Sequence, residues 1–286
     1  MIEVCQFVYN NDKSGKMKKI LCPIDFSDIA QNAIAYAAKL SKATGATLKL
    51  LNVQPNPVFA NAAENALVLE AVTGRLEELG SDVRRFLKIS CETEVIQSGG
   101  LLTDVIVESA DNFDLIVMGT HGVENLLEFL RGSNTYHAIR KSEIPVLLVP
   151  EGYVYSEIKS TVYAYNYLAK RTLPLTQLIP WIRSLKCQLT VLQVNEEAIS
   201  EDVNDEMKEL QFIFNEHLKG EDISIQFDST HSSEIAPAIH SYIHRSESDL
   251  LVLCTTQRNF IEAMFHKSVI KIITEIANYP VMVLHK

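Results

Sequence analysis

The sequence repeats itself after Pro150, and this repeat constrains the fold more than any other feature. Four apolar segments of the first half return in the second half at offsets of 141 or 135 residues: Ile20–Ile24 as Thr161–Tyr165, Leu50–Val53 as Val191–Val194, Asp114–Met118 as Asp249–Leu253, and Ile144–Val149 as Tyr279–Leu284. A repeat of this length indicates a duplicated domain and not a solenoid unit. We therefore predict two domains, 17–150 and 160–286, joined by a linker over 151–160.

Within the first half, short apolar segments alternate with segments of helical periodicity. Strands are predicted at 20–24, 47–53, 93–97, 115–118 and 146–149. Helices are predicted between the caps Ser27 and Gly45, over 66–87 with a distortion near Gly74 or Gly80, and over 101–110 and 135–141. Short apolar strands without polar alternation, separated by helices, are typical of a parallel sheet covered on both faces. The fold class is therefore α/β.

Glycines cluster between the fourth and fifth predicted strands, with the spacing Gly119-x2-Gly122-x9-Gly132-Ser133. Glycines at a strand exit let backbone amides approach a ligand closely, and the N-terminus of the next helix favours an anion. The pattern predicts a phosphate-binding loop. The alternative is a plain turn.

Composition and charge exclude some classes of function. The 286 residues include 47% apolar and 22% charged residues, as in soluble globular proteins, and the formal net charge is −10. This charge argues against broad binding of nucleic acid or anionic membrane surfaces, which need a basic face. No apolar run approaches the roughly 20 residues that span a bilayer.

The cysteines and the first residues bear on localisation. Five scattered cysteines, at 5, 22, 91, 187 and 254, have no metal-ligand spacing and are typical of idle thiols in a reducing compartment. Residues 1–16 are polar without a signal-peptide core, and we expect them to be an appendage or a misassigned start upstream of Met17. These observations predict a cytoplasmic protein.

Several of these segments together resemble a tandem member of the universal stress protein family. The resemblance lies in KILCPIDFS at 19–27, the strand ending at Val53, the segment Asp114–Gly119, and the glycine spacing above. It implies two repeated, doubly wound, five-stranded parallel sheets of the adenine nucleotide alpha hydrolase-like fold, with strand order 3-2-1-4-5. It also implies that the two fifth strands, Val146–Val149 and Val281–Leu284, pair with each other, and that nucleotide lies at the carboxyl ends of strands 1 and 4.

The family resemblance assigns roles to residues of the first half. Pro23 and Asp25 would lie near the adenosine, where the Asp25 carboxylate accepts hydrogen bonds from ribose hydroxyls or the adenine amine, and the backbone of Val53 would hold the adenine. The phosphates would be held by the remaining positions: Gly119, Gly122, Gly132, Ser133, and the amides of Asn134 and Thr135, with His121 and Arg131 adding charge. Asn134 departs from the small or β-branched residue common there. Asp25 has an alternative role as a helix cap, and His121 as an exposed loop residue.

The second half lacks this chemistry. Asn166 replaces Asp25, and the loop reads CTTQ at 254–257 and Lys267-Ser268 where the first half has its glycines. A Cβ at these positions opposes close backbone approach and positive φ. We predict that this half binds no ATP and serves as a structural partner domain. Its aromatic residues are expected to pack in its core or against the first domain rather than to stack on a base: Tyr163, Tyr165, Tyr167 and Trp181.

The sequence thus predicts a cytoplasmic universal stress protein that binds one ATP per chain, with Mg²⁺ held through the phosphates, and that acts in the stress response through conformation or partner binding. AMP or ADP are alternative ligands, and a homodimer and an unidentified protein partner are possible. The alternatives are a scaffold with a vestigial site and a slow ATPase. We assign no catalytic or metal-binding residue, because the sequence has no P-loop, HExxH motif or nucleophile–base pair.

Overall fold

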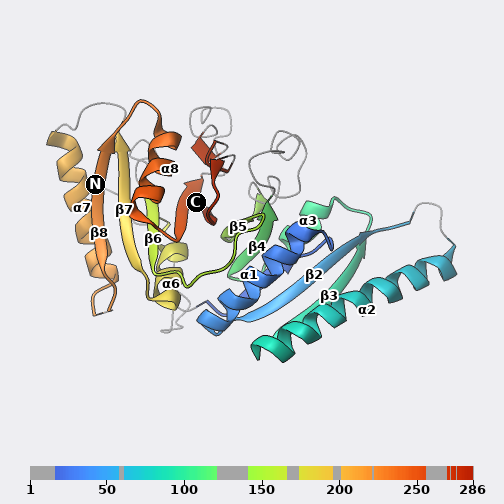
Figure 1. Cartoon of the computed structure of the whole chain (residues 1–286). Coiled ribbons are helices and arrows are strands. Elements are labelled where there is room, and N and C mark those ends of the chain that lie inside the picture. Colours follow the sequence, from blue (N-terminus) through green and yellow to red (C-terminus); the bar gives the residue numbers. More distant parts are fainter. Residues whose placement is uncertain are drawn as a thin grey trace. The chain divides into compact units, whose positions relative to one another are not determined.

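The chain folds into two compact units (Figure 1), one comprising Met17–Tyr155 and the other containing Ser156–Lys286. A computed structural model describes residues 17–57, 61–120, 141–165, 174–195, 201–220, 222–255, 269–270, 272–274 and 276–285. The division between the units falls within the predicted linker at 151–160.

The N-terminal unit is a parallel sheet with helices packed against it. Its strands are β1 (Lys19–Pro23), β2 (Thr47–Pro55), β3 (Cys91–Ser98), β4 (Leu115–Thr120) and β5 (Val146–Pro150). They pair in parallel in the order β3-β2-β1-β4-β5, which confirms the predicted order. The helices are α1 (Asp28–Thr44), α2 (Ala62–Leu87) and α3 (Leu102–Glu108).

Helix α1 has the two caps that the sequence predicts. The Ser27 hydroxyl accepts a hydrogen bond from Ala30 N–H at 3.2 Å, which satisfies one of the free amides of the first turn. Gly45 ends the helix in the left-handed region, at φ 77°, and its N–H donates to the Ser41 carbonyl. The apolar face between these caps, which includes the fully buried Ala33 and Ala37, packs against β1 and β4.

Helix α2 runs along the edge strand β3 (Figure 1). Most of its residues are exposed or half-buried. Only Leu76 and Gly80 are buried within its 26 residues. The predicted distortion is wrong, because α2 continues unbroken through Gly74 and Gly80. A Cβ on Gly80 would lie 2.5 Å from Thr93 Cγ2, so the glycine is what allows the helix to approach β3 so closely.

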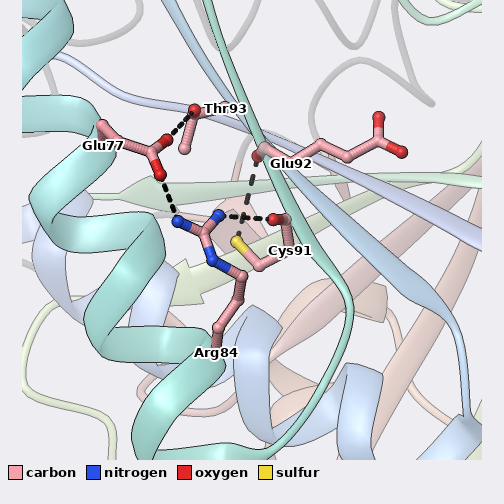
Figure 2. Close-up of polar contacts among 5 residues, drawn as sticks. All are labelled: Glu77, Arg84, Cys91, Glu92 and Thr93. Atoms are coloured by element: carbon pink, nitrogen blue, oxygen red, sulfur yellow. Dashed lines mark hydrogen bonds and ion pairs between the residues drawn. The ribbon is translucent and has the colours of Figure 1, made fainter.

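Polar contacts hold α2 to β3 beside this close approach (Figure 2). The Glu77 carboxylate accepts hydrogen bonds from Thr93 Oγ1, at 2.6 Å, and from the Arg84 guanidinium. A second guanidinium nitrogen of Arg84 donates to the Cys91 carbonyl at 2.7 Å. The hydrogen bond from Thr93, and then that from Arg84, lowers the pKa of Glu77. The cluster therefore fixes the position of a helix that buries little apolar surface.

The C-terminal unit repeats this architecture. Its strands are β6 (Ser160–Tyr165), β7 (Gln188–Asn195), β8 (Ile225–His231), β9 (Leu250–Thr255) and β10 (Val281–His285), in the parallel order β10-β9-β6-β7-β8. Its helices include α6 (Leu175–Leu185), α7 (Glu201–His217) and α8 (Ile235–Ser246). Tyr163 and Trp181 are buried in its core, as expected, and Tyr165 is partly buried; Tyr167 lies outside the described residues.

In both units an aspartate carboxylate accepts two backbone hydrogen bonds at the start of the first strand. Asp114 Oδ2 accepts from the N–H groups of Lys18 and Lys19 at 2.8 and 2.9 Å, which ties the start of β4 to the start of β1. Asp249 Oδ2 does the same for Lys159 and Ser160 at 2.8 and 2.9 Å. The pairing of the two fifth strands with each other stays a prediction.

No disulfide joins the cysteines of the described residues: Cys22, Cys91, Cys187 and Cys254. Burial raises the pKa of the Cys22 thiol to about 12 and that of Cys91 to about 11. Both are therefore inert strand thiols, as the sequence indicates. Among the helices that the structure describes, none is both long and apolar enough to span a bilayer.

Candidate functional site

The strand order of the N-terminal unit reverses between β1 and β4, where open parallel sheets bind ligands at the carboxyl end. These two strands pair at only two positions, Ile20 with Leu115 and Leu21 with Ile116, although both strands continue further. The Lys19 carbonyl accepts from Asp114 N–H, so alternate residues of β1, including Pro23, face β4. Proline has no N–H to donate to the ladder. Pro23 thus ends the pairing at the point where the strand order reverses.

At the same end of the sheet, Val53 is in register with Ile96 of β3, but among the described residues its β1 side has no strand partner. The β1–β2 ladder ends at Pro23 and Leu51, and the Leu51 carbonyl accepts from Ile24 N–H at 2.8 Å. Because alternate residues of a strand face the same neighbour, Val53 also faces the β1 side, but beyond the end of that ladder. Its N–H and C=O are therefore directed to the space next to the segment that follows β1.

Asp25 lies in that segment. Its side chain is exposed, and one of its two carboxylate oxygens accepts hydrogen bonds. Its Oδ1 accepts from the N–H of Ser27 at 3.0 Å and from the Ser27 hydroxyl at 2.6 Å. The alternative role of Asp25 as the helix cap is wrong, because Ser27 is the N-cap of α1. Asp25 instead holds the capping residue in place, and within the described residues its Oδ2 has no hydrogen-bond partner.

Phe26, between these two residues, is in the left-handed region at φ 64°. That conformation costs a non-glycine residue about 1–2 kcal/mol, and such strain is concentrated at functional sites. The guanidinium carbon of Arg75, on α2, lies 4.3 Å from the centre of the Phe26 ring. This cation–π contact helps to hold the turn in which Asp25 lies.

Asn52 is a positioning residue that the sequence analysis missed. It is 2% exposed, and its side-chain amide donates to the Ile24 carbonyl at 2.7 Å, just before Asp25. Its Oδ1 accepts from Gln54 Nε2 at 2.6 Å. The available signal was a polar residue near the end of the apolar run TLKLLNV, where a buried amide needs a partner.

Gly119 has a packing role that the sequence did not reveal. A Cβ at this position of β4 would lie 2.5 Å from Ile29 Cγ2 and 2.6 Å from the Ile29 carbonyl oxygen, in the first turn of α1. Gly119 therefore allows the first turn of α1 to pack closely against β4. Its contact with phosphate stays a prediction. The other predicted phosphate-binding residues lie outside the described residues: His121, Gly122, Gly132, Ser133, Asn134 and Thr135.

The corresponding positions of the C-terminal unit differ. Gln193 occupies the position of Asn52 and is fully buried, yet neither its Oε1 nor its Nε2 has a hydrogen-bond partner in the part of the chain that the structure describes. Cys254 occupies the position of Gly119, next to Leu284 of β10. Asn166, Gln257, Lys267 and Ser268 lie outside the described residues. The described ranges also contain no group of three or more His, Cys, Asp or Glu residues placed to hold a metal.

Comparison with known proteins relates the N-terminal unit to a protein family. Residues 16–150 match the universal stress protein family. The universal stress protein Sll1654 of Synechocystis sp. is 33% identical over 136 residues, which cover 46% of this chain and 85% of that protein. Universal stress protein A homolog 1 of Coxiella burnetii is 30% identical over 141 residues, covering 46% of this chain and 95% of its own length.

Both units together have a structural counterpart. A crystal structure of a universal stress protein from Archaeoglobus fulgidus superimposes with a TM-score of 0.71 and 14% identity, covering 95% of this chain and 97% of that one. The shared fold extends over both units, and the sequence similarity to the curated relatives covers 46% of the chain. The chain therefore belongs to the universal stress protein family.

Proposed function

We propose that the N-terminal unit binds one adenine nucleotide, ATP with Mg²⁺, at the carboxyl ends of β1 and β4. The observation that carries this proposal is the backbone of Val53, which faces the β1 side beyond the end of the β1–β2 ladder. An adenine ring presents an amino donor beside a ring-nitrogen acceptor, which a backbone C=O and N–H can satisfy together. Val53 would therefore bind the base through its backbone and not through its side chain.

Asp25 would bind the ribose. Its Oδ1 is held by Ser27, while its carboxylate stays exposed at the end of β1. Ribose hydroxyls are donors, and a charged acceptor strengthens such hydrogen bonds. Asn52 and the Phe26–Arg75 contact would preorganise this carboxylate, which reduces the cost of ordering the site on binding.

The glycine-bearing segment from Gly119 to Thr135 would hold the phosphates, and the phosphates would hold Mg²⁺. This part of the proposal rests on the sequence pattern and the family resemblance. In the C-terminal unit the pattern is lost, so we propose one nucleotide per chain. The bound nucleotide would change the conformation or the partner surface of a cytoplasmic stress-response protein.

Calorimetric titration of Mg·ATP into the full chain tests the site. Asp25→Ala should weaken binding at least tenfold, since a hydrogen bond to a charged group contributes about 1.5–3 kcal/mol. Asp28→Ala is a matched control, because it removes a second exposed carboxylate from the same helix N-terminus. It should change the affinity less than threefold. Equal losses in the two variants, or no binding by the wild type, would reject the site.

A scaffolding function is the second candidate, and exposed apolar side chains on α2 favour it. Leu67, Val68 and Phe86 are 66%, 54% and 69% exposed on this helix. Leu67 and Val68 are adjacent near the start of the helix, and neighbouring exposed apolar side chains are a feature of interaction surfaces. Light scattering of the wild type and of Leu67→Glu/Val68→Glu tests self-association through α2. A monomeric wild type would remove this support.

A further inference from the structure

Two histidines of the C-terminal unit lie one turn apart on α8. His240 and His244 have the i, i+4 spacing that places side chains on the same helix face. Their ring centres are 4.5 Å apart, with an interplanar angle of 75°. His244 is exposed and His240 is partly exposed, so solvent reaches the pair.

The separation of the rings suits a shared metal ion. Zinc–imidazole bonds are about 2.0–2.1 Å long, so each ring centre of a bound histidine lies roughly 3.2 Å from the ion. For ligand angles between about 90° and 109°, the two ring centres are then about 4.5–5.2 Å apart. The observed 4.5 Å lies at the short end of this interval.

Tyr279 supplies the second feature of such a site. It is 5% exposed, and its hydroxyl lies 3.1 Å from His240 Nδ1. Metal-binding histidines almost always donate the N–H of their other ring nitrogen to a fixed acceptor, which orients the ring. A metal at His240 Nε2 would select the tautomer in which Nδ1 carries the hydrogen and donates to the Tyr279 oxygen.

Imidazole nitrogens suit Zn²⁺, Ni²⁺ and Cu²⁺ better than they suit Mg²⁺ or Ca²⁺.

We propose that His240 and His244 together bind a divalent transition-metal ion of the Zn²⁺ type, with Tyr279 orienting His240 and solvent completing the coordination. Tyr279 precedes β10, so the site lies at the amino end of that strand. It is therefore remote from the carboxyl ends of the strands, where the family's nucleotide chemistry resides. Two protein ligands make this an exchangeable site and not a structural one, because structural zinc sites use four.

The test is a titration of ZnCl₂ into the untagged full chain after treatment with a chelator, followed by calorimetry and repeated with Co²⁺ followed by absorption. We expect one ion per chain at this site, and His244→Ala should weaken binding at least tenfold. Tyr279→Phe should weaken it about tenfold, as expected for loss of an outer-shell partner. His231→Ala is the matched control, since this exposed histidine of the same unit contacts the Asn195 carbonyl, and it should bind like the wild type.

His244 is exposed, so its replacement should leave the fold intact, and circular dichroism without metal checks this. The proposal is overturned if the wild type binds neither ion, or if His244→Ala and His240→Ala/His244→Ala bind as tightly as the wild type.

Discussion

Replacement of Gly119 by alanine separates the packing role of this residue from its proposed role in binding phosphate. The new Cβ would lie 2.5 Å from Ile29 Cγ2, 2.6 Å from the Ile29 carbonyl oxygen and 3.1 Å from the carbonyl carbon. Carbon atoms in contact are normally about 3.5–4.0 Å apart, so α1 would have to move away from β4 by about 1 Å. Overpacking of this kind costs about 1–3 kcal/mol. We expect the upper part of that interval, because backbone atoms of Ile29 cannot rotate away.

Gly74→Ala is the matched control. Gly74 lies in the exposed part of α2, and a Cβ there would meet nothing within 4 Å. It should stabilise the protein by about 0.5–1 kcal/mol, because alanine has the higher helix propensity. Both substitutions add one methyl group, but their effects on stability should be opposite, because only the methyl group at position 119 meets other atoms.

The assay is urea unfolding followed by two signals. Circular dichroism reports both units, whereas fluorescence reports the C-terminal unit, since Trp181 is the only tryptophan. Gly119→Ala should lower the midpoint seen by circular dichroism. Wild-type stability of Gly119→Ala, together with loss of ATP binding, would refute the packing argument and leave only the ligand role.

Two further predictions concern buried polar groups. Asn52→Ala should destabilise the N-terminal unit by about 1–3 kcal/mol, because it leaves the Ile24 carbonyl without its buried donor. Gln54→Ala removes a less buried partner of Asn52 and should lower the free energy of unfolding by less than half of that amount. Urea unfolding measures both changes. Burial lowers the pKa of His285 to about 4 from 6.5, so the folded state resists protonation. Stability should therefore fall as the pH drops from 6.5 to 4, by up to about 3 kcal/mol. His285→Phe should flatten this dependence in the fluorescence of Trp181, and an unchanged slope would contradict it.

The strand order and the first helix could be predicted because they depend on local signals. Each buried strand is a continuous apolar run, and the caps Ser27 and Gly45 have side-chain and backbone requirements that few other residues meet. The start of α2 was harder to place. The helix begins at Ala62 and not at 66, because Asn61 caps it by accepting from Glu64 N–H. Its first turns are exposed, so they carry no apolar face by which periodicity could locate them.

The contacts that shape the site could not be predicted, because they join residues far apart in the sequence. The constraint on Gly119 comes from Ile29, 90 residues away, and the partner of Asn52 is the carbonyl of Ile24. Neither contact has a local pattern. The sequence therefore suggests where a ligand would bind, but not which residues hold the binding groups in position.

The two units differ at this strand end in more than their glycines. In the C-terminal unit β6 and β9 pair at three positions, the third being Tyr163 with Val252. The corresponding pair in the N-terminal unit, Cys22 with Val117, would need an amide hydrogen at residue 23, which proline lacks. Ala164 carries the amide that Pro23 lacks. The C-terminal ladder thus extends into the position where the N-terminal strands have already separated.

The side-chain amide at the end of the second strand also differs between the two units. Asn52 holds the Ile24 carbonyl, whereas Gln193, one methylene longer, is buried with no hydrogen-bond partner among the described residues. A buried amide without partners costs free energy, so Gln193 contributes no ordered anchor at this strand end. Strand separation and the anchoring amide are features of the N-terminal strand end that do not involve the glycine loop. Their loss in the C-terminal unit supports the proposal of one nucleotide per chain without reference to the loop residues.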